Sequence, residues 1–144
     1  MFSKLLIAWC LLAACVAIHA TGLTLGFRWL RHRAAPVEGQ VWPATWLLIV
    51  IAGWTLFLHL LEIAVWAFAY AGFGALADLT TSIYFSAVTY TTTGYGDLVL
   101  PQDWRLVGAI EALTGILMCG LSTGLFFAVF SRIFRLHGGS DATN

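Results

Sequence analysis

The chain has 144 residues, of which 60% are hydrophobic and 10% charged, with no formal net charge and a mean hydropathy of +0.88. Soluble domains carry about 25% charged residues, so this composition excludes a soluble domain and indicates an integral membrane protein. Three apolar runs, at residues 5–27, 44–70 and 106–130, reach the roughly 20 residues that a helix needs to cross the hydrocarbon core. They predict an all-α membrane protein with three transmembrane helices.

The basic residues decide how the first run is interpreted. Lys4, followed by an apolar stretch that reaches Ala20, also fits a cleavable signal peptide. However, arginines follow the first and third runs, whereas Lys4 and Arg105 are the basic residues on the other side; these arginines are Arg28, Arg31, Arg33, Arg132 and Arg135. Cytoplasmic segments are enriched in basic residues, so the pattern favours an extra transmembrane helix at residues 1–30, a cytoplasmic basic loop at 31–43 and an N-terminus outside.

The C-terminal residues complete this topology. Residues 134–144 are polar and glycine-containing, which predicts a disordered cytoplasmic tail. We therefore expect a multi-pass protein of the plasma membrane with its C-terminus in the cytoplasm. All three cysteines lie in apolar runs, which argues against a disulfide framework.

A short polar segment separates the second and third runs. Asp78 is a good N-cap for a helix at residues 79–91, which is too short to span a bilayer and must enter and return. Irregular polar backbone at membrane depth is tolerated only where protein buries it or where it lines a water-filled cavity. The C-terminal end of this helix carries the negative end of its dipole, which would stabilise a cation near the membrane centre.

The residues after this helix read TTTGYGD, with Gly94 and Gly96 at alternate positions. Successive carbonyls point to one side when the backbone alternates between right-handed and left-handed conformations, and glycine reaches the latter without steric cost. The carbonyls of residues 92–95, with the Thr92 hydroxyl, could then replace the water around a dehydrated cation. One chain supplies one wall of such a ring, so several subunits are needed about an axis.

The run YTTTGYGDLVLP between two apolar helices resembles the pore module of potassium channels, over residues 44–133. The resemblance implies an outer helix at 44–70, a re-entrant pore helix at 79–91, a selectivity-filter loop at 92–96 and an inner helix at 106–133. It also implies a tetrameric pore, as a homotetramer in the lipid bilayer, through which K+ ions permeate passively. No cofactor, nucleic acid or soluble substrate is expected.

The resemblance also assigns roles to individual residues. The filter would consist of Thr92, Thr93, Gly94, Tyr95 and Gly96, with K+ held by the carbonyl oxygens of the first four. Asp97 would lie at the outer mouth, and Gly115 would be the gating hinge of the inner helix. Three residues spaced three and four apart would line the cavity: Ile116, Cys119 and Thr123.

Several positions depart from the family pattern. Thr93 stands where valine or isoleucine is usual, and a hydroxyl there needs a partner. Tyr84 and Phe85 stand where tryptophans often brace the filter, and Val88 replaces a glutamate found in some members. Asp97 would use the Tyr84 hydroxyl instead. An alternative function is therefore a weakly selective monovalent cation channel, and a non-conducting regulatory subunit also stays open.

Ionisable residues inside the apolar runs are the remaining candidates. His59 and Glu62 lie three apart on one helical face and can pair, with His19 at a comparable depth in the first run. An isolated charge there costs about 2.5–3.5 kcal/mol, so either a proton-sensitive tie or a hydrogen-bonded packing contact is expected. Glu111 could reach the back of the pore helix and bond its threonines or the filter backbone, again as a functional group or as polar glue.

A different functional class uses the same histidines. His19 and His59, on neighbouring helices, could hold a b-type haem as axial ligands, which would make the chain an electron carrier. The sequence contains no nucleophile and base pair, phosphate-binding loop or thiolate metal site, so no enzyme is expected.

Overall fold

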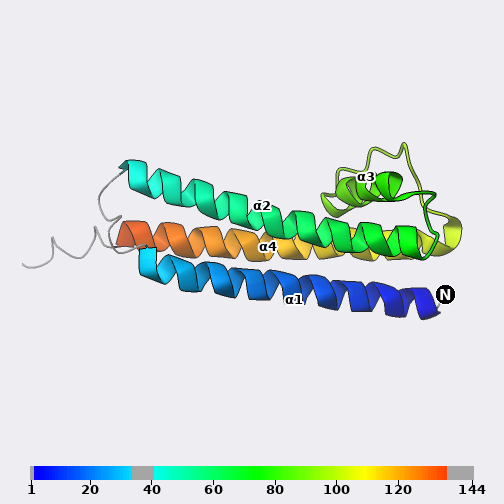
Figure 1. The fold of residues 1–144 in the computed structure, drawn as a ribbon, viewed down its shortest axis with the longest axis horizontal. Coiled ribbons are helices and arrows are strands. Elements are labelled where there is room, and N and C mark those ends of the chain that lie inside the picture. Colours follow the sequence, from blue (N-terminus) through cyan, green and yellow to red (C-terminus); the bar gives the residue numbers. More distant parts are fainter. Residues whose placement is uncertain (1, 34–40, 136–144) are drawn as a thin grey trace, which may run out of the picture.

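The computed structural model describes residues 2–33 and 41–135. Three long helices lie side by side, α1 (Phe2–Arg33), α2 (Val41–Gly72) and α4 (Arg105–Arg135), and the short helix α3 (Leu79–Tyr90) packs against one end of them (Figure 1). All three long helices are long and apolar enough to cross a membrane. The predicted all-α fold with three spanning helices is therefore confirmed.

The helix bounds differ slightly from those predicted. Each spanning helix extends a few residues beyond its predicted range, whereas α3 ends at Tyr90, one residue before its predicted end. The predicted tail at 134–144 and much of the loop at 31–43 lie outside the described residues.

The extra helix α1 packs closely on α2 through small residues. A side chain at Gly22 would overlap Leu58, and one at Gly26 would lie 3.2 Å from the indole nitrogen of Trp54. The same indole donates a hydrogen bond of 3.0 Å to the Gly22 carbonyl oxygen. Glycine at both positions lets the two backbones approach, as in many membrane helix pairs.

The N-terminal end of α1 meets the segment that precedes α4. Lys4 forms an ion pair with Asp103, in the 3₁₀ helix η2 (Gln102–Trp104), and its ammonium lies 4.8 Å from the centroid of the Trp104 ring. The N-terminus thus lies at the same end of the bundle as α3 (Figure 1). This arrangement is expected from three crossings, because the chain crosses with α1 and returns with α2 before it reaches α3.

The start of α3 is fixed by its cap. The carboxylate of Asp78 accepts hydrogen bonds from the Thr81 backbone N–H (2.9 Å) and from its hydroxyl (2.7 Å). These bonds hold the pKa of Asp78 below its usual value, and the bond from the backbone N–H contributes more than the bond from the hydroxyl. The predicted N-cap is therefore confirmed, and it sets where the helix begins and hence where its C-terminal end lies.

Candidate functional site

The backbone turns sharply after α3. The N–H groups of Thr93 and Gly94 both donate to the Val88 carbonyl oxygen, at 3.0 and 3.3 Å. Gly94 and Gly96 have φ angles of 55° and 78°, as the alternation argument predicts. Thr92 also has a positive φ of 58°, which the sequence did not indicate, because a β-branched residue pays a steric cost there. The helix end thus holds the segment in its unusual conformation.

The carbonyl groups of residues 92–95 remain available to bind a cation. Among the described residues, no hydrogen bond ends on the carbonyl oxygens of residues 92–95. Tyr95 is 72% exposed, so a single chain leaves one side of the filter segment uncovered. The geometry is suited to offering several oxygens to a cation, provided that other walls complete the ring.

The hydroxyl of Thr93 has a partner. It lies 2.9 Å from the Thr91 hydroxyl, which itself donates to the Ala87 carbonyl oxygen at 2.7 Å. Because the Thr91 proton is used there, Thr93 is the donor between the two hydroxyls. The polar side chain at this unusual position is therefore anchored to the end of α3.

The aspartate after the last glycine is also anchored to α3. The Tyr84 hydroxyl donates to the Asp97 carboxylate at 2.6 Å, as predicted. This hydrogen bond raises the pKa of Tyr84 above its ordinary value. Phe85, the neighbouring departure, packs edge-on against Tyr70 with ring centroids 5.4 Å apart, so it supports α3 from the other side.

Glu111 reaches the back of α3, but with a different partner from those predicted. Its carboxylate accepts hydrogen bonds from Ser86 on α3 (2.5 Å) and from Tyr70 on α2 (2.7 Å), and all three side chains are fully buried. The predicted threonines and filter backbone are not its partners, because the threonines of α3 lie elsewhere on the helix. Tyr70 and Ser86 were not identified from the sequence.

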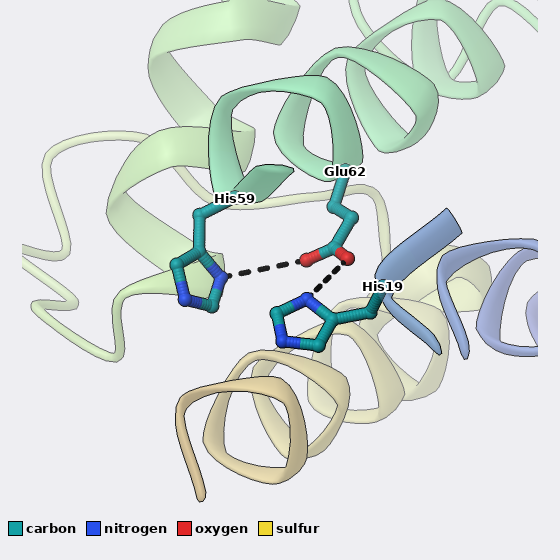
Figure 2. Close-up of side chains that lie close together, drawn as sticks. All are labelled: His19, His59 and Glu62. Carbon is teal, nitrogen blue, oxygen red and sulfur yellow. Dashed lines mark hydrogen bonds and ion pairs between the residues drawn. The ribbon is translucent and has the colours of Figure 1, made fainter. Parts of the chain in front are cut away.

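A second buried carboxylate lies deeper in the bundle. Figure 2 shows Glu62 between two imidazole rings: His19 Nδ1 lies 2.9 Å from one carboxylate oxygen and His59 Nδ1 lies 3.4 Å from the other. His19 and Glu62 are fully buried, and the His59 side chain is 16% exposed. The predicted pairing of His59 with Glu62, and the placement of His19 beside them, are confirmed.

Two further residues complete this cluster, and the sequence reasoning missed both. The Tyr90 hydroxyl donates to Glu62 and lies 3.1 Å from His59 Nδ1. The Ser122 hydroxyl lies 3.1 Å from Nε2 of each histidine. Tyr90 lies directly before the filter segment, but neither a tyrosine at a helix end nor a lone serine in an apolar helix indicates a buried partner. We call these five residues the histidine cluster; it joins all four helices.

The histidine cluster leaves no room for a haem held by His19 and His59. The two ring centroids are 5.2 Å apart, and the rings lie directly beside each other. A porphyrin between two axial ligands would have to separate these rings. The electron-carrier alternative thus does not fit this arrangement.

Helix α4 has one exposed face and one face that packs against the other helices. Ile116, Cys119 and Thr123 are all exposed along one stripe of the single chain, whereas Met118 and Ser122 are buried against the other helices. The predicted cavity residues thus lie on a face that the rest of the chain leaves uncovered. Their role in lining a cavity stays a prediction.

Gly115 marks the closest approach of α4 to α3. A side-chain carbon there would lie 2.8 Å from the carbonyl carbon of Tyr90 and would overlap its oxygen. The helix continues through this position without interruption. The structure therefore gives Gly115 a packing role, and its role as a hinge stays a prediction.

Comparisons with known proteins point to one family. A family profile described as "Ion channel" matches residues 44–132, which is more than half of the chain. The A-type voltage-gated potassium channel KCND3 of Rattus norvegicus and that of Homo sapiens are each 36% identical over 78 residues, 50% of this chain. The potassium voltage-gated channel protein Shal of Drosophila melanogaster is 32% identical over 66 residues, 44% of this chain. The matches span 12% and 11% of these relatives' lengths. No solved structure matches.

Proposed function

Since the chain belongs to the ion channel family, with the pore module of potassium channels, we propose that it forms a homotetrameric channel selective for K+. The observation that carries the proposal is the pair of left-handed glycines, Gly94 and Gly96, directly after a short helix that does not span the membrane. The family is one of passive channels, so the chain is assigned no catalytic reaction.

Permeation follows from the chemistry of the filter segment. The carbonyls of residues 92–95 substitute for the hydration shell of K+, while the C-terminal dipole of α3 points toward the same region and favours a cation. Asp97, held by Tyr84, adds negative charge at the mouth. Together these groups lower the barrier that a dehydrated cation meets in the bilayer.

A ring of filters requires several chains. The exposed filter of one chain and the exposed stripe of Ile116, Cys119 and Thr123 both belong on the axis of an assembly. Four copies of the chain would place four such walls around one pathway. Cross-linking and mass measurement of the detergent-solubilised protein would test the number of subunits.

The proposed orientation places the N-terminus outside and the C-terminus in the cytoplasm of the plasma membrane. The arginine distribution supports it, and the ion pair of Lys4 with Asp103 supports an N-terminus on the filter side. Tags at both ends, probed from each side of intact cells, test this topology. A mature protein that begins at Thr21 would contradict it.

Weak selectivity among monovalent cations is the second candidate, because of Thr93. The hydrogen bond between the Thr93 and Thr91 hydroxyls supports a rigid filter segment, because it ties Thr93 to the end of α3. We therefore favour K+ selectivity and expect Thr93→Val to change the K+ to Na+ flux ratio little. A large rise in selectivity in that variant would favour the weakly selective channel for the natural sequence.

The deciding experiment measures K+ and Na+ fluxes into liposomes of known protein content. K+ should pass much faster than Na+, and Gly94→Ala should abolish selective flux because a side chain resists the left-handed conformation at φ 55°. Gly53→Ala is the matched control, since a side chain there meets no atom within 4 Å. Equal K+ and Na+ fluxes through the unmodified protein would refute the proposal.

The cavity face is tested through Cys119. A small cationic thiol reagent added from the cytoplasmic side should modify this exposed thiol in open channels and reduce K+ flux by placing a fixed positive charge on the path. The Cys119→Ala channel should conduct and resist the reagent. Cys10 faces outward on α1 and Cys15 is buried, so neither should mediate block. Block that persists in Cys119→Ala would show that the inner helix is rotated from the proposed register.

A further inference from the structure

The histidine cluster contains the donor atoms of a metal site. One ligand atom from each of His19, His59 and Glu62 can be chosen so that all lie within 4.8 Å of one another (Figure 2); His19 and Glu62 are buried, and His59 is partly buried. We propose that these three residues bind a divalent transition-metal ion of the zinc type between α1 and α2. This inference does not depend on the proposed ion selectivity.

The two distances from the imidazoles to the carboxylate are close to those between neighbouring ligands of a tetrahedral ion. With Zn–N and Zn–O bonds near 2.0–2.1 Å, neighbouring ligand atoms in a tetrahedron lie about 3.3 Å apart. The His19 and His59 Nδ1 atoms lie 2.9 and 3.4 Å from the oxygens of Glu62. The Tyr90 oxygen, 3.1 Å from His59 Nδ1, is the nearest protein candidate for a fourth ligand. The three ligand atoms lie within 4.8 Å of one another, so a bound ion would draw them closer together.

Ser122 presents both imidazoles in the orientation that a metal needs. Its oxygen lies 3.1 Å from Nε2 of His19 and of His59, while both Nδ1 atoms face Glu62. If both Nε2–H groups donate to this one oxygen, both Nδ1 lone pairs are free to bind a metal. Metal-binding histidines typically donate their second N–H to such an outer partner.

The ligand types select the class of ion. Two imidazole nitrogens and a carboxylate suit Zn²⁺, Co²⁺ or Ni²⁺, whereas Mg²⁺ and Ca²⁺ prefer sites made of oxygen. Such an ion would link α1 to α2, and through Tyr90 to the end of α3 directly before the filter segment. The site would thus give the extra helix a direct hold on the pore module.

The test uses the full chain in detergent with the other histidines and the exposed cavity thiol removed, as a His32→Ala, His137→Ala, Cys119→Ala background. Dialysis against Zn²⁺ followed by elemental analysis should give one ion per chain, and Co²⁺ should give the strong visible absorption of a tetrahedral complex. His19→Gln or Glu62→Gln should weaken binding by at least about 100-fold, and Ser122→Ala by about 10–100-fold. Glu111→Gln is the matched control, because it alters an equally buried glutamate outside the histidine cluster and should bind normally.

Three results would overturn the proposal. They are the absence of stoichiometric metal in the background protein, a Co²⁺ spectrum typical of an octahedral aqua complex, and a tetrahedral spectrum that survives in His19→Gln. The first two need no variant within the histidine cluster, so misfolding of such a variant cannot rescue the proposal. Because binding is measured without flux, failure here leaves the channel proposal standing, and absence of K+ flux leaves the metal site standing.

Discussion

Two buried glutamates hold the same face of α3, and they differ in their partners. Glu111 accepts from Ser86, and Glu62 accepts from Tyr90, which is one helical turn further along. Both carboxylates are fully buried. Around Glu111 the recorded partners are hydroxyl groups, whereas Glu62 also faces two imidazole rings.

From this difference we infer that Glu111 braces the helices and that Glu62 belongs to the proposed metal site. Around Glu111, Tyr70 and Ser86 both donate to the carboxylate, and neither side chain is a usual ligand for a transition-metal ion. The imidazoles around Glu62 bring nitrogen lone pairs as well as protons, and these lone pairs are what the proposed metal ion would use. Burial alone does not separate the two cases; the neighbours do.

The largest effect should come from a substitution that disturbs the Glu111 contacts and the histidine cluster together. Gly115 lies one turn after Glu111 and touches the backbone of Tyr90. Gly115→Ala should force α4 away from α3 and destabilise the protein by about 3 kcal/mol, since a fixed backbone cannot yield. Thermal unfolding in detergent would measure the loss. Gly120→Ala is the control, because a side chain there meets no atom within 4 Å of the same chain, and an equal loss in both variants would contradict the argument.

The next largest effect should come from removing the brace. Glu111→Ala leaves the buried hydroxyls of Tyr70 and Ser86 without their carboxylate, at about 2 kcal/mol, while metal binding stays unchanged. Glu111→Gln, which keeps the shape and one acceptor oxygen, should recover part of the stability. A loss of metal binding in the alanine variant would show that the two glutamates form one unit.

A matched pair of tyrosine variants should sharpen the comparison. Tyr70→Phe and Tyr90→Phe each remove one hydroxyl that donates to a buried glutamate, and each should destabilise by about 1–2 kcal/mol. Only Tyr90→Phe should also weaken Zn²⁺ binding, because only Tyr90 belongs to the histidine cluster. Unfolding curves with and without Zn²⁺ test this, and equal stabilisation by Zn²⁺ in both variants would contradict the role given to Tyr90.

The smallest effect concerns the exposed counterpart of these buried pairs, Tyr84 with Asp97. The hydrogen bond raises the tyrosine pKa above its ordinary value of 10.0, so its stabilising contribution is complete below pH 10 and is lost as the pH rises through the raised value. Absorbance of tyrosinate during alkaline titration should lose one late-titrating group in Tyr84→Phe, with little change in unfolding temperature near neutral pH. An unchanged titration curve would remove the support for this bond.

Several features could be predicted because they depend on neighbours along the chain. Hydropathy over about 20 residues fixed the three spans, Asp78 fixed the start of α3, and alternate glycines fixed the turn that follows. Helical spacing was enough to pair His59 with Glu62. The Tyr84 bond to Asp97 also spans a short stretch of sequence.

Other features were decided only by the tertiary structure. Helices that are apolar on every side carry no periodic signal for how each is rotated, so nothing in the sequence indicated that Ser122 and Tyr90 face the two histidines. The same holds for Glu111, whose partner is Ser86 because α4 is rotated toward that face of α3. The sequence thus supplied the ionisable groups and their depth in the membrane, and helix packing supplied their partners, since rotation and close approach depend on contacts among all four helices.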